Sequence, residues 1–282
     1  MTSFRAYAKI NLGLFVIEKR PDGYHNIETV FHRVNLFDEI SFNASRQIGV
    51  SSSSSAAPSD ERNICFKAAT LLAKYLKVTN GVMISIRKNI PVGAGLGGGS
   101  SNAATVLLHL PAFWGHTASN DLLHSLALQL GSDVPYFMTT GSASAKGRGE
   151  DLEYFTLDVP YTILLCNPRI HISTAWAYQH VTPHQRKIDL KDLVVRGMKD
   201  TSLLATLKND FEEPVFREHT AIKEVKELML QSGAAFSSMS GSGSMVYGLY
   251  SDPQKAKEAA GILNSRGWNT YLTHPHFSPV EP

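Results

Sequence analysis

The residues best suited to chemistry form one glycine-rich run, whose sequence from Pro91 to Ala104 is Pro-Val-Gly-Ala-Gly-Leu-Gly-Gly-Gly-Ser-Ser-Asn-Ala-Ala. Glycine lets the backbone adopt positive φ angles and approach a ligand without a Cβ atom in the way. A turn of free N–H groups at the positive end of a helix binds phosphate, and serine hydroxyls can add donors there. The run therefore predicts a cradle for the phosphates of a nucleotide. Its residues are Pro91, Val92, Gly93, Ala94, Gly95, Leu96, Gly97, Gly98, Gly99, Ser100 and Ser101.

Two other nucleotide motifs and a plain linker compete with this interpretation. A P-loop is excluded because no lysine follows the glycines. The dinucleotide fingerprint GxGxxG is present at Gly93, Gly95 and Gly98. However, residues 82–87 before it alternate as in a half-buried strand, whereas the first strand of a dinucleotide-binding domain is continuously apolar. A flexible linker is disfavoured because Leu96 interrupts the glycines and a helical pattern follows at once.

A lysine and an aspartate are the candidates for phosphoryl transfer, which needs positive charge near the moving group and a residue that holds the acceptor hydroxyl. Residues 3–17 alternate as a strand, in which Lys9 and Asn11 share the face opposite the apolar residues. Asp133 precedes Pro135, which suits a first helical turn, and the helix dipole would keep the carboxylate ionised. A solvated surface lysine and an ordinary capping aspartate remain the alternatives.

Two further turns could contact a ligand. Tyr24 and His25 directly follow a Pro-Asp-Gly turn, where they could stack on a base and hydrogen-bond it, or could simply pack in a hairpin. Residues 240–244, with the sequence Ser-Gly-Ser-Gly-Ser, could form a second phosphate or substrate loop or a surface turn. Residues 51–58 are rich in serine, and we expect a surface loop there that is of no interest to catalysis.

Apolar periodicity predicts the elements that must position these residues. A helix should follow the glycine run, and Pro111 should end or kink it. The character of the sequence changes near residue 156, which predicts a domain boundary. We expect strands at 3–17, 27–34, 39–43, 82–87, 161–166 and 245–250, and a glycine-punctuated hairpin at 143–150. Helices are expected at 61–77, 119–130, 173–180, 200–218, 219–232 and 253–266.

Composition excludes several classes of protein. The 282 residues are 43% hydrophobic and 18% charged, which is typical of a folded protein with one large or two ordinary domains. A net charge of +2 argues against nucleic acid or an anionic membrane as the main partner. Neither Cys65 nor Cys166 belongs to a metal-binding pattern, so we expect buried, reduced thiols. The lack of an apolar leader and of a membrane-length apolar stretch predicts a cytoplasmic protein.

Taken together, several short segments resemble the motifs of the GHMP kinases, a family that phosphorylates small hydroxyl compounds with ATP. Each segment alone is weak, but jointly they span nearly the whole chain in the family's order and are specific. Pro111 and the serine-rich run depart from the pattern without touching the expected site. The matching segments are Ala8–Leu12, Arg20–His25, Pro91–Ala104, Leu130–Phe137, Gly147–Glu150, Asn209–Glu212 and Ser240–Ser244.

This resemblance implies an α+β protein with the two-domain GHMP kinase fold. An N-terminal α/β domain at residues 1–155 would bind ATP, and a smaller C-terminal α+β domain at residues 156–282 would close the substrate side. Lys9 and Asp133 would be the catalytic pair. In that pair Asp133 would take or orient the proton of the substrate hydroxyl, and Lys9 would stabilise charge or set the pKa of Asp133.

The resemblance also implies a substrate that carries cytidine diphosphate, namely 4-diphosphocytidyl-2-C-methyl-D-erythritol, phosphorylated on its 2-hydroxyl on the route to isoprenoid precursors. Tyr178 would stack on the cytosine, with Trp176 as the alternative. The residues expected to bind this substrate are Asn11, Tyr24, His25, Tyr178, Gly241 and Ser242.

The implied cofactor is ATP, with Mg²⁺ carried on the nucleotide because the sequence has no dense carboxylate cluster to hold a metal. A monomer or weak homodimer is expected, without a nucleic-acid or membrane partner. Three alternatives stay open. A kinase of the same fold could act on homoserine, mevalonate or a sugar, and the GxGxxG match could mark an NAD-dependent dehydrogenase. A non-catalytic binding module is the third, against which the presence of both Lys9 and Asp133 argues.

Overall fold

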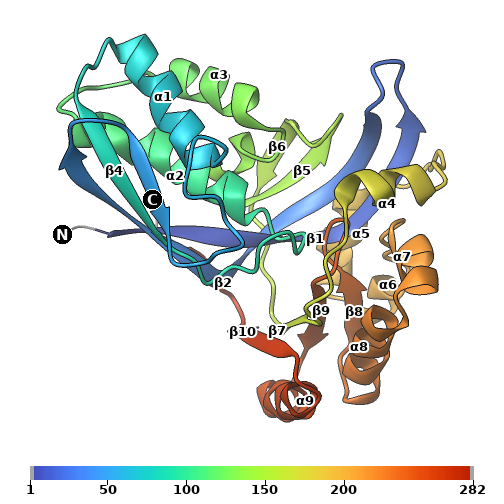
Figure 1. The fold of residues 1–282 in the computed structure, drawn as a ribbon. Coiled ribbons are helices and arrows are strands. Elements are labelled where there is room, and N and C mark those ends of the chain that lie inside the picture. The colour runs from blue at the N-terminus through green and yellow to red at the C-terminus, as the bar shows by residue number, and fades with distance from the viewer. Residues whose placement is uncertain (1–2, 280–282) are drawn as a thin grey trace.

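The computed structural model describes residues 3–279 and contains two β-sheets, one from each half of the chain (Figure 1). The strands of the first sheet are β1 (Ser3–Lys19), β2 (His25–Ser45), β3 (Gly49–Ser52), β4 (Gly81–Arg87), β5 (Ser142–Lys146) and β6 (Asp151–Phe155). This six-stranded sheet has the order β3-β4-β2-β5-β6, and β1 pairs with β2. All neighbours are antiparallel except β3 and β4.

Helices cover one face of this first sheet (Figure 1). Their apolar faces pack with the sheet into one cluster that includes Leu72, Leu107 and Leu126. Ser119 caps α3 by accepting a hydrogen bond from the amide of Leu122. The helices are α1 (Ile64–Leu76), α2 (Gly98–Phe113), α3 (Asn120–Leu130) and the short 3₁₀ helix η1 (Pro135–Met138).

The second sheet is built from β7 (Thr162–Asn167), β8 (Phe236–Met239), β9 (Val246–Tyr250) and β10 (Asn269–Thr273). It is antiparallel, in the order β10-β7-β9-β8. Two of its helices, α8 and α9 below, pack against it (Figure 1). The helices of this half are α4 (Thr174–His180), α5 (Leu190–Gly197), α6 (Thr201–Leu204), α7 (Glu212–Glu218), α8 (Thr220–Gln231) and α9 (Pro253–Ser265).

Strand β1 is buried on both faces, which allows it to position site residues from the middle of the molecule. On one face Ala8, Ile10 and Leu12 join a hydrophobic cluster that also contains side chains of β7 and β9. The other face carries Lys9 and Asn11, both buried. Because this cluster draws on both halves of the chain, the predicted domain boundary near residue 156 stays a prediction.

The predicted helix at 200–218 is wrong. Within that range the chain forms two short helices, α6 and α7, which an irregular segment at 205–211 separates. The cause is pairing with β1. The amide of Leu14 donates to the carbonyl of Lys208 and the amide of Asp210 donates to the carbonyl of Leu14, each over 2.9 Å. Helix backbone cannot make this ladder, so the long-range pairing overrides the local pattern.

The other differences concern short or merged elements. The strands expected at 27–34 and 39–43 are parts of the single strand β2. The pattern does not predict β3, β8, β10 or α5, and β3 has the sequence Gly-Val-Ser-Ser, which lacks an apolar alternation. Helix α2 continues through Pro111 and ends two residues later. Both cysteines are free and buried, as expected. Within the described residues, no helix has the length and apolar character needed to span a membrane.

Candidate active site

The glycine-rich run forms an open turn that leads into α2. Gly93, Gly95 and Gly97 adopt left-handed φ angles of 69°, 79° and 67°, and α2 begins directly after them. Within residues 3–279, none of the backbone amides of residues 93–100 donates to a backbone carbonyl. Free amides at the positive end of a helix are the groups that a phosphate needs. We call residues 91–101 the phosphate cradle.

The cradle is held against the turn formed by residues 240–244. A Cβ atom on Gly95 would lie 2.1 Å from the carbonyl oxygen of Ser240, so only glycine fits there. The Ser240 hydroxyl donates to the Gly95 carbonyl over 3.0 Å, and the Met245 amide donates to the Ala94 carbonyl over 3.2 Å. This turn is almost wholly buried, so the interpretation as a surface turn is wrong.

A cavity of about 410 Å³ opens beside the cradle, and several residues that the sequence analysis missed line it. The end of the serine-rich segment, Ala57 and Pro58, forms part of the wall. The expectation that residues 51–58 form a surface loop without a catalytic role stays a prediction, although the end of this segment borders the cavity. Asn63 fixes this wall, because its side-chain amide donates to the Pro58 carbonyl over 2.6 Å. The buried Asn102, whose Oδ1 has no partner in the described part of the chain, lines the same cavity.

Lys88, a second missed residue, lines this cavity and forms a buried ion pair with Asp38. The Asp38 carboxylate also accepts hydrogen bonds from the amides of Asn89 and Ile90, over 2.7 and 2.9 Å. These bonds fix the chain just before it enters the cradle. The available signal is the position of Lys88 just after a predicted strand and five residues before the first glycine of the run.

Lys9 and Asp133 meet at the edge of the cradle. The Lys9 Nζ lies 3.6 Å from Asp133 Oδ2, and it donates to Asn11 Oδ1 over 2.7 Å and to the Gly95 carbonyl over 3.3 Å. Lys9 is 4% exposed, so the interpretation as a surface lysine is wrong. Burial lowers the pKa of its ammonium group below the ordinary value, and the Asp133 carboxylate opposes that shift. Asp133 itself lies in the turn just before η1 and is partly exposed.

Asn11 links these parts. Its side-chain amide donates to the Thr29 hydroxyl over 2.8 Å while its Oδ1 accepts from Lys9. The backbone amide of Asn11 donates to the Ser240 hydroxyl over 3.3 Å. Asn11 therefore orients the Lys9 ammonium, and its predicted contact with a substrate stays a prediction.

A second cavity, of about 180 Å³, lies beside Lys9 and Asp133. An aromatic wall borders it: the His25 ring stacks on Tyr178 with centroids 4.9 Å apart, and Tyr178 meets Phe211 edge-on. Burial lowers the pKa of His25, and Lys19 acts in the same direction, so the imidazole is neutral at pH 7. The cavity is lined by Lys9, Asn11, Leu14, Ile27, Phe31, Gly95, Gly97, Asp133, Arg148, Thr174, Tyr178, Phe211, Gly241 and Ser242.

The two aromatic candidates on α4 point to different places. Tyr178 lines the cavity, whereas Trp176 stacks on His180 with centroids 4.4 Å apart. Tyr24 is 55% exposed at the tip of the hairpin between β1 and β2, and the Arg148 guanidinium lies 5.0 Å from its ring centroid. The geometry thus favours Tyr178 over Trp176 as a stacking partner for a ligand.

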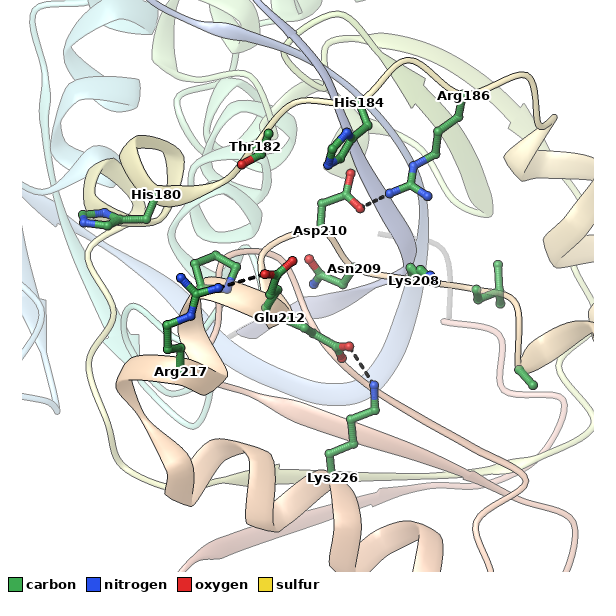
Figure 2. Close-up of a pocket in the computed structure, with 14 residues that line it drawn as sticks. His180, Thr182, His184, Arg186, Lys208, Asn209, Asp210, Glu212, Arg217 and Lys226 are labelled. Atoms are coloured by element: carbon green, nitrogen blue, oxygen red, sulfur yellow. Dashed lines mark hydrogen bonds and ion pairs between the residues drawn. The ribbon is translucent and has the colours of Figure 1, made fainter.

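A third cavity, of about 500 Å³, borders the segment Asn209–Glu212 (Figure 2). Figure 2 shows the ion pairs of Asp210 with Arg186 and of Glu212 with Lys226. Glu213, which also lines the cavity, pairs with Arg217. Each carboxylate that lines this cavity is therefore matched by a cation, and we assign no ligand to it.

The segment 209–212, which we call the brace, ties three parts of the molecule together. The Asn209 side chain donates to the carbonyls of Met239 and Gly241 over 2.7 and 2.8 Å. The Asp210 carboxylate accepts the amide of Val16 in β1 over 2.8 Å. Glu212 accepts the amide of Met239 over 2.8 Å. The brace thus holds β1 and the 240–244 turn, and both of these contact the cradle.

Within the described residues, no group of three or more His, Cys, Asp or Glu side chains could hold a metal ion. The free amides of the cradle suit phosphate oxygens, which can carry a cation with them.

Comparison with known proteins places this geometry in a family. The model for the GHMP kinases N terminal domain matches residues 63–141, and the model for the GHMP kinases C terminal domain matches residues 190–268. A protein of Chlorobium limicola named 4-diphosphocytidyl-2-C-methyl-D-erythritol kinase is 44% identical, with 99% of this chain and 98% of that protein covered. A protein of the same name from Prosthecochloris aestuarii is 46% identical, with 93% and 94% covered. A crystal structure of 4-(cytidine 5'-diphospho)-2C-methyl-D-erythritol kinase superposes with a TM-score of 0.81 at 33% identity, over 96% of this chain and 98% of that one.

Proposed function

The chain belongs to the GHMP kinase family, and on that premise we propose that it transfers the γ-phosphoryl group of ATP to the 2-hydroxyl of 4-diphosphocytidyl-2-C-methyl-D-erythritol. Two relatives and one solved structure named for this substrate align over nearly the whole chain. The reaction would contribute to the synthesis of isoprenoid precursors in the cytoplasm.

The observation that carries the proposal is that the cradle, Lys9 and Asp133 share one space. Gly95 and Gly97 of the cradle line the same small cavity as Lys9 and Asp133. A terminal phosphate on the cradle amides would therefore face an alcohol held by Asp133. That is the arrangement that in-line phosphoryl transfer requires.

In this scheme Asp133 accepts a hydrogen bond from the acceptor hydroxyl and takes its proton as the new O–P bond forms. The Lys9 ammonium orients the Asp133 carboxylate and balances the negative charge on the transferred group. Its lowered pKa follows from burial, which also strengthens its attraction for an anion. Mg²⁺ bound to ATP would neutralise phosphate charge. Because the transition state is loose, positioning by Lys9 and the cradle contributes alongside proton removal.

The aromatic wall supports a pyrimidine at the far end of the substrate. The Tyr178 ring offers a face for stacking, and Tyr24 offers a second one at the hairpin tip. The neutral His25 imidazole carries one donor and one acceptor, which suits the mixed edge of cytosine. Gly241 and Ser242 would close the side next to the brace. Residues 1–155 would then supply the ATP side and part of the pocket for the pyrimidine base. Residues 156–282 would supply the rest of that pocket.

The test is an assay of ADP formation from ATP with 4-diphosphocytidyl-2-C-methyl-D-erythritol, homoserine and mevalonate as separate acceptors. We expect the wild type to use the first and not the other two. Asp133→Ala should lower kcat by about 10²- to 10⁴-fold with ATP affinity unchanged, and Asp133→Asn should behave alike because an amide cannot accept the proton.

Each failure has its own meaning. Turnover of homoserine or mevalonate instead would keep the fold and replace the substrate. A fully active Asp133→Ala would remove the role of a base and leave positioning alone. Binding of NAD with no ATP turnover would support the dehydrogenase alternative.

A further inference from the structure

The small cavity beside Asp133 contains one cation that the scheme above does not use. Its charged lining residues are Lys9, Asp133 and Arg148. Lys9 is committed to Asp133, to Asn11 and to a cradle carbonyl. Arg148 is therefore the positive side chain left to face a ligand in this cavity.

Arg148 lies between the two ends of the proposed substrate site. At one end its guanidinium is 5.0 Å from the ring centroid of the exposed Tyr24. At the other end its neighbour Gly149 is so close to the catalytic pair that a Cβ there would lie 3.5 Å from Asp133 Oδ1. The turn that carries Arg148 is fixed to β2, because the Ile27 amide donates to the Gly147 carbonyl over 2.7 Å. Arg148 thus lies between Tyr24 at one end of the proposed substrate site and Asp133 at the other.

Glu150 orients the Arg148 guanidinium but leaves its two terminal nitrogens unbound. Its Oε1 accepts from Arg148 Nε over 3.2 Å, and its Oε2 accepts from the Arg148 backbone amide. Within residues 3–279 no hydrogen bond engages the two terminal nitrogens of Arg148. Those nitrogens form the planar fork that binds phosphate oxygens in pairs.

We propose that Arg148 binds the diphosphate of the acceptor substrate and thereby selects esters of a nucleoside diphosphate over simple alcohols. The inference rests on the proposed function, since it needs a substrate with a pyrimidine at one end, a hydroxyl at the other and a diphosphate between them. A molecule laid from Tyr24 and Tyr178 to Asp133 brings its diphosphate past Arg148. Charge-assisted hydrogen bonds from its two terminal nitrogens, which Glu150 does not engage, offset the cost of desolvating the phosphates.

The first measurement is steady-state kinetics of Arg148→Met and Arg148→Lys. Loss of a charge-assisted fork should raise KM for 4-diphosphocytidyl-2-C-methyl-D-erythritol by about 10- to 100-fold in Arg148→Met. KM for ATP should stay within about twofold and kcat should change little, because the diphosphate is bound equally in ground and transition states. Arg148→Lys should recover part of the affinity.

Lys146→Met is the matched control. Lys146 lies on the same hairpin and is exposed, its ammonium being 4.0 Å from Glu28. It does not line the cavity. The control removes the same charge, so an equal rise of KM in Lys146→Met would mean that long-range attraction, and not contact with Arg148, is responsible.

A binding measurement separates a contact with phosphate from a structural role. Calorimetry with the ATP site saturated by ADP compares cytidine with cytidine 5'-diphosphate. The wild type should bind the diphosphate more tightly than cytidine, whereas Arg148→Met should bind the two alike and keep the wild-type affinity for cytidine. A merely structural role would weaken both ligands together.

The outcomes distinguish this inference from the proposed function. An active wild type with unchanged KM and unchanged diphosphate preference in Arg148→Met would overturn the inference alone. A wild type that binds neither cytidine ligand and does not use the substrate would overturn both. Loss of cytidine affinity together with a lower melting temperature in Arg148→Met, unrelieved by Arg148→Lys, would also overturn the inference and make Arg148 a structural residue.

Discussion

The phosphate cradle and the brace contact the same 240–244 turn, but they differ in whether their polar groups have hydrogen-bond partners within the protein. Backbone amides of residues 93–100 find no backbone acceptor in the described chain, and Gly95 is packed too closely for any side chain. In the brace, both polar atoms of the Asn209 side chain and both carboxylate oxygens of Glu212 are bonded to other protein groups. The cradle amides are partly open to water and have no protein acceptor within the described residues, so they remain able to donate to a ligand.

This difference shows how the 240–244 turn can contribute both to the stability of the fold and to the position of the cradle. The brace satisfies the turn from the side of α7 and fixes its carbonyls. The cradle can then keep its own amides free, because the brace holds the turn that the cradle contacts. Substitutions in the cradle should therefore affect turnover more than stability, and substitutions in the brace should do the reverse.

Among the substitutions that compare the cradle with the brace, the largest effect on turnover should come from Gly95→Ala in the cradle. The added methyl would meet the Ser240 carbonyl at 2.1 Å, and the φ of 79° disfavours any side chain. Displacing the cradle from Lys9 by about 1 Å should lower kcat/KM for ATP by about 100- to 1,000-fold. The kinase assay and ADP calorimetry measure this directly.

Gly261→Ala is the control for this substitution. Gly261 lies in α9 with open space around its Cβ position, so alanine there should leave turnover unchanged and stabilise the helix by about 0.5–1 kcal/mol. Wild-type turnover in Gly95→Ala would mean that the cradle is not held against the 240–244 turn.

The brace should show the opposite behaviour in Asn209→Ala. The substitution leaves the carbonyls of Met239 and Gly241 and the amide of Phe211 without their partner in a buried place. The free energy of unfolding should fall by about 4 kcal/mol, as measured by urea denaturation. Turnover of the protein that remains folded should fall less than in Gly95→Ala.

An exposed asparagine provides the reference for that measurement. Asn264 accepts a hydrogen bond from Thr270 over 3.1 Å at the surface, and Asn264→Ala should cost about 0.5 kcal/mol or less. If Asn209→Ala were as mild as Asn264→Ala, the brace would not be what holds the turn.

The same contrast explains how far the sequence could be interpreted. The cradle was predictable because its chemistry depends on a continuous stretch, in which glycine spacing and the following helix are both visible. Lys9 and Asn11 could be placed on one face of β1 because strand alternation is local. The roles assigned to Lys9 and Asp133 stay predictions, although the structure brings the two side chains within 3.6 Å of each other.

What could not be predicted depends on partners that are distant in the chain. The brace is irregular because Leu14 pairs with it, and no sequence pattern within residues 200–218 predicts that pairing. The wall at Pro58 and the Asp38–Lys88 pair likewise join segments that no local periodicity connects. Arg148 looked like part of a glycine-punctuated hairpin, because only the fold shows that this hairpin ends beside Asp133.

The smallest effects on stability are expected for two ion pairs that line the cavity of Figure 2, and the loss should differ between the two pairs. The Glu212–Lys226 pair is 2.6 Å long with side chains 13% and 25% exposed, whereas the Glu213–Arg217 pair is 2.8 Å long with side chains 81% and 75% exposed.

Water screens the second pair almost completely, so Arg217→Met should change the free energy of unfolding by about 0.3 kcal/mol. Lys226→Met leaves the partly buried Glu212 without its cation while Glu212 still accepts the Met239 amide, and it should cost about 1–2 kcal/mol. Urea denaturation of the two variants side by side, each losing one cation, measures the difference. Equal losses would mean that exposure does not decide the strength of these pairs, and that Glu212 supports the turn through its hydrogen bonds alone.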